Sequence, residues 1–246
     1  MGQWYYIATD WKTVLEQLEI MDFEVLWRKS LVPVDAVNYR RGGMSSVGKL
    51  AMANTQGQIV TVFIKRHQRH HCRHPWRPWQ QIPTLRREYC QLRRFANYGW
   101  SVPNIIFYAE CQDRAILGLQ EISGAIDLGT LLCQQHLGRD LRHQIARAIA
   151  TFHAHRWQHS ALYPKHILIN PITNTVSFID LEGARRRWIR YFAILRDLDS
   201  LNRHIVGISV LERARFLKTY LHYLPRKFSF AKIFRKLWYK HQLKSS

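Results

Sequence analysis

The chain has 246 residues, of which 47% are hydrophobic and nine are tryptophan. This content excludes a disordered polymer, because it offers enough apolar surface for the core of one large domain or two lobes. With 37 Lys and Arg against 17 Asp and Glu, the formal charge of +20 predicts an anionic partner, such as nucleic acid, a phospholipid surface or a phosphorylated substrate.

The first residues, MGQWYYIATDWKTVLEQ, lack the basic start and apolar stretch of a signal peptide, and no run of about 18 uncharged apolar residues occurs. We therefore expect a soluble, cytoplasmic chain. The four cysteines lie far apart without paired metal spacing, which favours reduced structural thiols. They are Cys72, Cys90, Cys111 and Cys133.

The chain begins with a helical pattern that gives way to strands. Apolar positions in residues 11–28 recur at helix-like spacing, and VDAVNYR then alternates like a strand. The run LAMANTQGQIVTVFIKR predicts two strands joined by a turn at residues 54–57.

The next segment combines an insertion, one main helix and two more strands. Residues 67–83, rich in His, Arg, Trp and Pro, have no clean period and predict a long exposed insertion. A strong helix runs from Thr84, which we expect to cap it, to Tyr98, and Gly99 is a natural stop. NIIFYAE and AILGLQEI then predict two further strands.

The pattern becomes helical from Asp127 onward. Helical periodicity covers residues 128–135, 138–156, 195–205 and 211–224, and a basic tail follows from 225 to 246. A short motif region lies between the second and third of these helices. A strand-rich half with one helix, joined to a helical half, predicts an α+β fold with two lobes.

The stretch YRRGGMSSVGKL contains most of a G-x-x-x-x-G-K phosphate loop, formed by Gly43, Gly48 and Lys49. Leu50, however, stands where a Walker loop has the hydroxyl that holds magnesium. A Walker loop also needs a helix directly after its lysine, whereas a predicted hairpin follows here. We therefore expect these glycines to lie between antiparallel strands, either as a phosphate-covering turn or as an ordinary hairpin connection.

A lysine and a glutamate follow this turn in a suggestive order. Lys65 ends the strand segment VFIK, and Glu88 lies in the next helix. In the amino-terminal lobe of protein-kinase-like enzymes, loop amides cover the phosphates, and a strand lysine oriented by a helix glutamate bridges two of them. The alternative is a solvated surface ion pair of little energetic value.

Two motifs in the second half support this interpretation. HSALYPKH, residues 159–166, stands where a kinase has H-R-D-L-x-x-x-N, and VSFIDLEG resembles D-F-G, with Asp180 after an apolar strand. A carboxylate there is typical of the residue that holds Mg²⁺ against nucleotide phosphates. The sequence therefore predicts a bilobal protein-kinase-like fold as a single domain, 1–246. We expect an antiparallel-sheet N-lobe with one main helix (1–121) and a mostly helical C-lobe (122–246).

Several segments extend the likeness: FIKRH, IPTLRREYCQLRRFANYGWSVPNIIFYAE, QEISGAIDL, LYPKHILIN, FIDLEGARRR and RDLDSLNRH. Together they resemble the lipopolysaccharide kinases of the Kdo/WaaP group, and especially its InaA-like branch, over residues 36–206. The resemblance implies a bacterial kinase that uses ATP and magnesium on sugars of the lipopolysaccharide inner core, at the inner face of the cytoplasmic membrane of a Gram-negative bacterium. The histidine that this family has in place of the kinase asparagine falls on His166, and its metal-binding aspartate falls on Asp180.

One position departs from the kinase pattern. Ala161 stands where the H-R-D aspartate accepts the proton of the attacking hydroxyl. Loss of a general base, which contributes roughly 10² to 10⁴ in rate, could leave a slow enzyme that relies on positioning and charge stabilisation. Alternatively Glu182, or as a second candidate Asp127, replaces the base. The third alternative is a pseudokinase that binds nucleotide without phosphoryl transfer and has a regulatory or scaffold role at the membrane.

The candidate site follows from these motifs. We expect catalytic roles for Lys65, Glu88, Asp180, His166 and Glu182, ATP contacts from Gly42, Gly43, Ser45, Ser46, Lys65 and Glu121, and a magnesium ion on Asp180 and His166. Glu121 has the place of the kinase hinge, where backbone groups bind adenine. His159 is expected to support the loop of the metal aspartate, and Asp197 or Asp199 to tether the catalytic-loop backbone. A hydrogen-bonded core residue is the alternative for His166.

Three basic segments remain. The His/Cys tract 67–74 matches no ordinary zinc spacing and is interpreted as an exposed basic loop. Together with residues 185–190 it predicts an electropositive rim for an acidic, phosphorylated sugar, or a solvated surface. The tail predicts a basic amphipathic helix that lies on an anionic membrane, packs on the C-lobe, or does both. No sequence signature of a nucleic-acid-binding fold is present, so a nucleic-acid-binding module is a remote alternative. We expect the chain to be a monomer.

Overall fold

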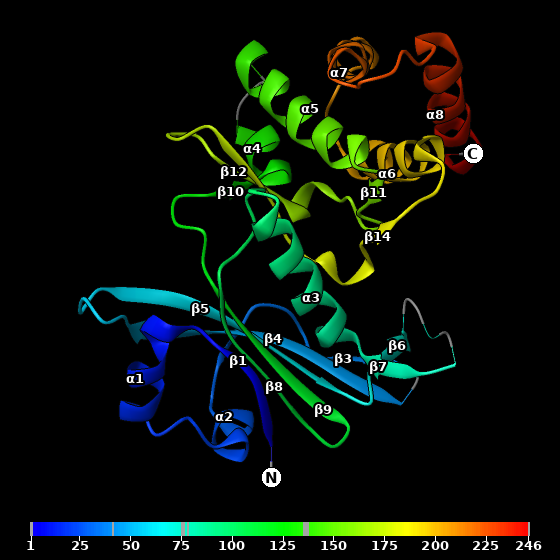
Figure 1. Ribbon diagram of the computed structural model, residues 1–246. Coiled ribbons are helices and arrows are strands. Elements are labelled where there is room, and N and C mark those ends of the chain that lie inside the picture. The colour runs from blue at the N-terminus through cyan, green and yellow to red at the C-terminus, as the bar shows by residue number, and fades with distance from the viewer. Residues whose placement is uncertain (1, 41, 75–76, 78, 135–137, 246) are drawn as a thin grey trace. The chain divides into compact units, whose positions relative to one another are not determined.

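The computed structural model describes residues 2–40, 42–74, 77, 79–134 and 138–245 (Figure 1). The chain divides into two compact units, Met1–Ile122 and Ser123–Ser246. Both antiparallel strands and helices are present, which confirms the mixed α and β composition expected from the sequence.

The first unit is built on a seven-stranded antiparallel sheet. Its main path is β1 (Gln3–Ile7), β8 (Ile105–Cys111), β9 (Arg114–Gln120), β5 (Ile59–Gln68), β4 (Gly43–Ala53) and β2 (Val32–Pro33), and β3 (Asn38–Arg40) also pairs with β4. The predicted turn joins β4 to β5, where the Asn54 side chain accepts hydrogen bonds from the N–H groups of Gln56 and Gln58. The predicted strand pair is confirmed, whereas β1 was absent from the prediction.

The predicted amino-terminal helical segment is two helices rather than one. α1 (Thr9–Gln17) ends shortly before Glu19, whose φ of 54° is left-handed, and Asp22 then caps α2 (Phe23–Arg28) through the N–H groups of Glu24 and Val25. A capping aspartate favours a new helix start over continuation of the old helix.

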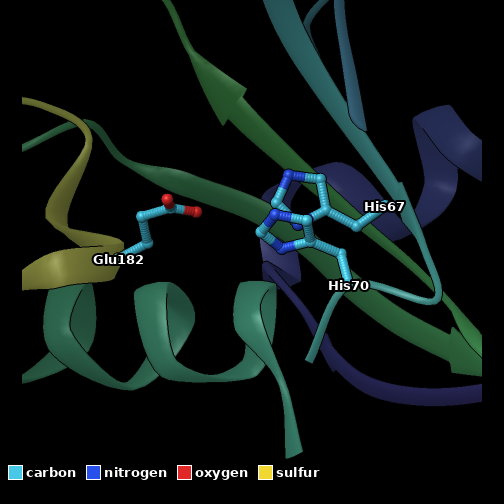
Figure 2. Close-up of side chains that lie close together, drawn as sticks. All are labelled: His67, His70 and Glu182. Atoms are coloured by element: carbon cyan, nitrogen blue, oxygen red, sulfur yellow. The ribbon is translucent and has the colours of Figure 1, made fainter. Parts of the chain in front are cut away.

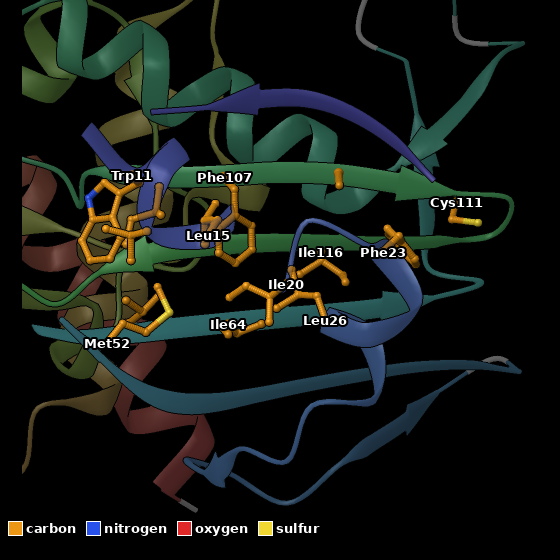
Figure 3. Close-up of a cluster of buried hydrophobic side chains, with 14 residues drawn as sticks. Trp11, Leu15, Ile20, Phe23, Leu26, Met52, Ile64, Phe107, Cys111 and Ile116 are labelled. Carbon is orange, nitrogen blue, oxygen red and sulfur yellow. The ribbon is translucent and has the colours of Figure 1, made fainter. Parts of the chain in front are cut away.

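The two short helices cover one face of the sheet and supply much of the core of this unit (Figure 3). Trp11, Leu15 and Leu26 from the helices pack against side chains of the central strands, among them Ile64 and Phe107. Strand alternation assigns Ile64 to this face, so the next residue, Lys65, points to the opposite face.

The main helix of this unit, α3 (Thr84–Asn97), packs against β8, β9 and β5, and stacks Tyr89 on Tyr108. It ends before Gly99, whose φ is +72°, so the predicted stop is confirmed. The predicted cap is wrong: Pro83 is the N-cap, and the Thr84 hydroxyl instead donates to the His70 carbonyl at 3.1 Å. The Thr84 hydroxyl thus bonds to a residue 14 positions earlier in the chain, and not to a backbone N–H of α3.

The segment predicted to be one exposed insertion has regular structure at both ends. β5 continues through Gln68, and β6 (His71–Arg73) pairs with β7 (Gln81–Pro83). Residues 75, 76 and 78, also part of that prediction, lie outside the described residues. His67, the first histidine of the tract, therefore lies in strand β5 of the sheet and not in a loop.

The second unit contains α4 (Leu128–Gln134), α5 (Arg139–Ala154), α6 (Arg190–His204), α7 (Val210–His222) and α8 (Phe230–Ser245). Between α5 and α6 lie the short strands β11 (Trp157–Gln158), β12 (Ile167–Asn170), β13 (Thr175–Phe178) and β14 (Arg185–Arg186), with the 3₁₀ turns η1 (Pro164–His166) and η2 (Leu181–Gly183). β10 (Ile126–Asp127) joins β12 and β13 in a small antiparallel sheet. The predicted helices are confirmed, although α6 starts earlier than expected.

The basic tail forms the helix expected for it. Ile233 and Leu237 are buried, and α8 packs against α6 and α7. Of the alternatives predicted for this helix, packing of its apolar side on the helical unit is therefore the one observed for these two residues. Lys232, Arg235 and Lys236 remain exposed. Among the described residues, no helix combines the length and apolar character needed to cross a bilayer.

Candidate functional site

Lys65 and Glu88 form an ion pair in the first unit. Lys65 Nζ lies 2.6 Å from Glu88 Oε1, and the side chains are 16% and 1% exposed. Lys65 is on central strand β5, opposite Val47 on one side and Leu117 on the other, and Glu88 is on α3. A carboxylate this buried would be very costly without a cation beside it. The solvated surface pair, the alternative left open by the sequence, is therefore wrong.

A second ion pair, not predicted from the sequence, fixes the same helix. Arg86 Nε donates to Glu110 Oε1 at 2.6 Å, and the Tyr108 hydroxyl donates to the same carboxylate. Hydrogen bonding to Glu110 raises the pKa of Arg86, and burial raises the pKa of Tyr108. Since α3 is held on both β5 and β8, the position of Glu88 is well determined.

The predicted glycine loop is a short turn. Gly42, with φ of +75°, connects β3 to β4, and Gly43 begins β4. A Cβ on Gly43 would lie 2.7 Å from the Arg69 carbonyl oxygen, so only glycine fits there. Ser45 and Ser46 belong to β4 and pair with β5, which commits their backbone groups to the sheet instead of to an open loop. The glycines lead into a strand, as predicted.

Glu121 follows β9 at the end of the first unit. Its N–H donates to the Thr61 carbonyl at 2.9 Å, and its carboxylate lies 3.5 Å from Lys49 Nζ, with both side chains well exposed. The side chain therefore makes a weak surface pair. Any adenine contact from this residue would have to come from its carbonyl.

Two histidines of the basic tract lie together beside the start of α3. Figure 2 shows the rings of His67 and His70 against each other, with centroids 4.5 Å apart. His70 Nδ1 is 2.9 Å from the Thr84 hydroxyl, and burial lowers the pKa of His70. These contacts give both side chains a place in the packing of β5 against α3.

In the second unit, Asp197 tethers the loop that follows β11. Its carboxylate accepts hydrogen bonds from the N–H groups of His159 and Ser160, at 2.6 and 2.9 Å. His153 Nε2 lies 3.1 Å from the same carboxylate, and His153 Nδ1 is 2.7 Å from the Tyr220 hydroxyl. Asp197 is fully buried. The predicted tether from a helix is confirmed, and Asp197 rather than Asp199 provides it.

His159 supports the residue before Asp180. Its Nε2–H donates to the Ile179 carbonyl at 3.0 Å, and the side chain is fully buried. Burial lowers the pKa of His159, which keeps the ring neutral. The expected supporting role is confirmed by this bond, since it fixes the backbone from which Asp180 projects.

Among the residues next to the Asp197 tether and the His159 bond, Ser160 and Asp180 have left-handed backbones. Asp180 has φ of 58° and Ser160 has φ of 72°. Such conformations cost energy and persist where surrounding contacts impose them, often at functional sites. The Ser160 hydroxyl accepts from Gln158 Nε2 at 2.9 Å, and Arg185 Nε lies 3.3 Å away. Sequence analysis missed Ser160, because the left-handed backbone leaves no residue-type signal there.

His166 and Asp180 approach each other in a way that favours a cation. His166 Nδ1 must donate to the Ala161 carbonyl at 2.8 Å, because a carbonyl oxygen only accepts. A neutral His166 then turns the Nε2 lone pair toward Asp180 Oδ2, 3.3 Å away. Two lone pairs at this distance repel unless Nε2 is protonated or a metal ion is bound by both atoms. His166 is thus both a hydrogen-bonded buried residue and a potential ligand.

The two candidate substitutes for the missing base differ. Asp127 caps α4, because its carboxylate accepts hydrogen bonds from the Thr130 N–H at 3.0 Å and the Thr130 hydroxyl at 2.6 Å. These bonds stabilise the start of the helix. Glu182 lies in η2, and a carboxylate oxygen of it is within 4.8 Å of one of Asp180. Ala161 contributes only its carbonyl, the acceptor for His166. Glu182 remains the better candidate.

An antiparallel sheet with a buried lysine–glutamate pair, and a tethered loop beside a strained aspartate, are features of kinase-like enzymes. The model of the lipopolysaccharide kinase (Kdo/WaaP) family matches residues 24–220, and the chain belongs to this family. It is also similar to Protein InaA of Escherichia coli (strain K12), with 29% identity over 199 residues, covering 76% of this chain and 89% of InaA. The predicted family is confirmed, and membership supports a kinase-like function.

Proposed function

We propose that this chain is an ATP-dependent phosphotransferase that phosphorylates a sugar hydroxyl of the lipopolysaccharide inner core or a related glycan. The approach of His166 Nε2 to Asp180 Oδ2 carries the proposal, because it pairs two metal-type donors beside a tethered loop. The enzyme would act as a monomer at the inner face of the cytoplasmic membrane. Family membership supports the reaction class, and the sugar acceptor is the finer part of the proposal.

Lys65 would bind the phosphates of ATP. Its ammonium group lies 2.6 Å from the Glu88 carboxylate. Because Glu88 is buried and its helix is fixed by Arg86, Lys65 is held in place before any ligand binds. A preorganised cation is well suited to a transition state whose charge lies on phosphoryl oxygens. Gly42 and Gly43 at the β3–β4 turn, and the side chains of Ser45 and Ser46 on β4, would add contacts.

Asp180 and His166 would hold the divalent metal ion, which supplies charge neutralisation on the phosphates. The separation of 3.3 Å between the two donor atoms is compatible with neighbouring ligands of one small ion, which lie about 3 Å apart in octahedral coordination. Magnesium prefers oxygen ligands, while imidazole suits softer ions. We therefore expect Mn²⁺ to bind this donor set at least as well as Mg²⁺.

Ala161 supports a second candidate, a pseudokinase that binds nucleotide for a regulatory or scaffold task. In the enzyme, Glu182 would accept the proton of the attacking hydroxyl, or the reaction would proceed slowly without a base. The two candidates differ in phosphoryl transfer, not in nucleotide binding.

The first experiment measures thermal stabilisation by ATP with Mg²⁺ or Mn²⁺. We expect stabilisation of the native chain and its loss in Lys65→Ala and Asp180→Ala. Matched controls are Lys12→Ala, an exposed lysine on α1, and Asp113→Ala, whose side chain is 33% exposed against 32% for Asp180. Stabilisation that survives both site variants would rule out nucleotide binding by these residues.

The second experiment measures transfer of label from ATP to a purified core oligosaccharide. Transfer that is lost in Asp180→Ala selects the enzyme, and nucleotide binding without transfer to any glycan selects the pseudokinase. Glu182→Gln keeps the size of the side chain and removes its basicity. A loss of roughly 10² or more in Glu182→Gln would support the substitute base, and full activity would exclude it.

A further inference from the structure

Residues 185–192, from β14 into the first turn of α6, expose three large apolar side chains within five positions. Trp188 is 94% exposed, and Ile189 and Phe192 are each 56% exposed. Within the described part of the chain, Trp188 is the most exposed large apolar side chain. Several such side chains kept together in water mark a surface that meets a partner.

The backbone on both sides of Trp188 is fixed. Before it, β14 pairs with β11, and Arg187 donates its N–H to the Arg156 carbonyl at 2.8 Å and its Nε–H to Gln158 at 2.6 Å. After it, α6 begins, with the Phe192 N–H donating to the Ile189 carbonyl. The exposure of Trp188 is therefore built into the fold.

Cations gather around this segment. Arg190 donates to the carbonyls of His153 and Ala154 at the end of α5. Burial lowers the pKa of Arg190, and the positive charges of Arg156 and Arg226, from two other segments of the chain, lower it further. The sequence has no Asp or Glu between Glu182 and Asp197, and none after Glu212.

The start of the basic tail adjoins the same surface. The rings of Tyr191 and Phe228 stack with centroids 6.4 Å apart, and Lys236 Nζ lies 5.2 Å from the centre of the Tyr191 ring. The fold thus brings together two basic segments that are far apart in sequence. We call the result the Trp188 surface; it comprises Arg156, Arg186, Trp188, Ile189, Phe192, Arg226 and Lys227, all of them exposed.

We propose that the Trp188 surface docks the chain on an anionic phospholipid bilayer, with its apolar side chains in the interface and its cations near the lipid phosphates. Tryptophan is favoured at the membrane interface, and clustered Lys and Arg are attracted to anionic leaflets. A phosphorylated sugar would satisfy the cations, but it has no hydrocarbon for Ile189 and Phe192. The proposal goes beyond phosphoryl transfer and involves none of the residues assigned to it.

The test is co-sedimentation of the full chain with vesicles of phosphatidylcholine, with and without phosphatidylglycerol. We expect binding only where phosphatidylglycerol is present, and weakening by at least about tenfold in Trp188→Asp and in Arg226→Gln/Lys227→Gln. Trp79→Ala is the matched apolar control, since Trp79 is 81% exposed in the first unit. Lys12→Gln/Arg28→Gln is the charge control, with two exposed cations of that unit. Both controls should bind like the native chain.

A second measurement reports on Trp188 itself. Lipids brominated in the acyl chain should quench the tryptophan fluorescence of the native chain more than that of Trp188→Phe. The other tryptophans contribute equally to the fluorescence of both proteins. Equal vesicle binding by Trp188→Asp and the native chain would overturn the proposal, as would binding that ignores phosphatidylglycerol. Unchanged vesicle binding in Trp188→Asp together with lost binding of a soluble core oligosaccharide would assign the surface to the acceptor instead. Lys65→Ala should bind vesicles normally, which separates this proposal from the catalytic one.

Discussion

Asp197 and Asp180 are carboxylates of the same unit with opposite surroundings. Asp197, on α6, is fully buried and accepts hydrogen bonds from two backbone N–H groups, with His153 beside it. Asp180 follows β13 with its side chain 32% exposed, has a left-handed backbone, and faces a histidine whose neutral form offers it no proton. Both sites use the same side chain, but Asp197 is buried among backbone hydrogen bonds, whereas Asp180 is partly exposed beside His166.

The difference separates a structural acid, Asp197, from Asp180, which we propose as a metal ligand. Buried polar groups in a stable fold are paired, and a paired carboxylate has little left to offer a ligand. A strained backbone such as that of Asp180 costs stability and persists where the surrounding structure imposes it, often at functional sites. The tether formed by Asp197 provides the rigidity that the Asp180 turn needs. Variants of the two regions should therefore separate stability from binding.

The largest effect on stability is expected from Asp197→Ala. It removes the acceptor for the N–H groups of His159 and Ser160 and leaves them buried, so we expect a loss of about 3–5 kcal/mol in the free energy of unfolding, measured by urea denaturation. Asp199→Ala, two positions along the same helix, breaks a contact of 3.4 Å with Arg203 and should cost less than Asp197→Ala, because the Asp199 side chain is partly exposed. Equal losses of stability in the two variants would contradict the assignment of the tether to Asp197 rather than Asp199.

A smaller, pH-dependent effect is expected from His159. Burial lowers its pKa, so below about pH 6.5 the unfolded state binds a proton that the folded state does not. The free energy of unfolding should therefore fall as the pH falls from about 6.5 toward the lowered folded pKa, with a slope of up to about 1.4 kcal/mol per pH unit from this group. Above that window His159 contributes no slope. His70, whose pKa is also lowered, adds a slope of the same sign.

The measurement is denaturation at several pH values in the presence of a chelator, so that no metal ion affects His166. His159→Asn should reduce the slope below pH 6.5, whatever it does to the stability at neutral pH. The exposed His222, replaced in His222→Asn, is the control and should leave the slope unchanged. An unchanged slope in His159→Asn would mean that this ring is protonated in the folded state.

The sequence predicted most of the elements and the order of the motifs, because strand alternation and helical periodicity are local properties. It could not choose between Asp197 and Asp199. Two positions on a helix point about 200° apart, so only the packing of α6 decides which one is buried. The partners of Asp197 were hidden for the same reason, since His153 is 44 residues away.

Other features depend on contacts that no local pattern encodes. The need for glycine at position 43 follows from the close approach of the Arg69 carbonyl. Thr84 loses its predicted capping role to a hydrogen bond with His70. Residues 185–190 were recognised as a basic run, but the exposure of Trp188 within it follows from the anchoring of β14 on β11. Local chemistry was thus predictable, while the choice of partner was not.

The smallest effect on stability and the clearest effect on binding are expected from Asp180→Asn. Asparagine tolerates the left-handed backbone as well as aspartate does, so the change removes charge without new strain. Because the side chain is one-third exposed, we expect the free energy of unfolding to change by less than about 1 kcal/mol in urea denaturation. Binding of Mn²⁺, followed by electron paramagnetic resonance, should weaken by at least about tenfold, because the amide oxygen lacks the charge that a divalent ion needs.

Asp113→Asn is the matched control, with nearly the same side-chain exposure in the first unit, and should alter neither quantity. If Asp180→Asn destabilised the chain as much as Asp197→Ala while Mn²⁺ binding stayed the same, Asp180 would be a structural acid as well. The strain at φ of 58° would then serve the packing of η2 rather than a ligand, because a turn that holds no ion gains nothing from an exposed negative charge.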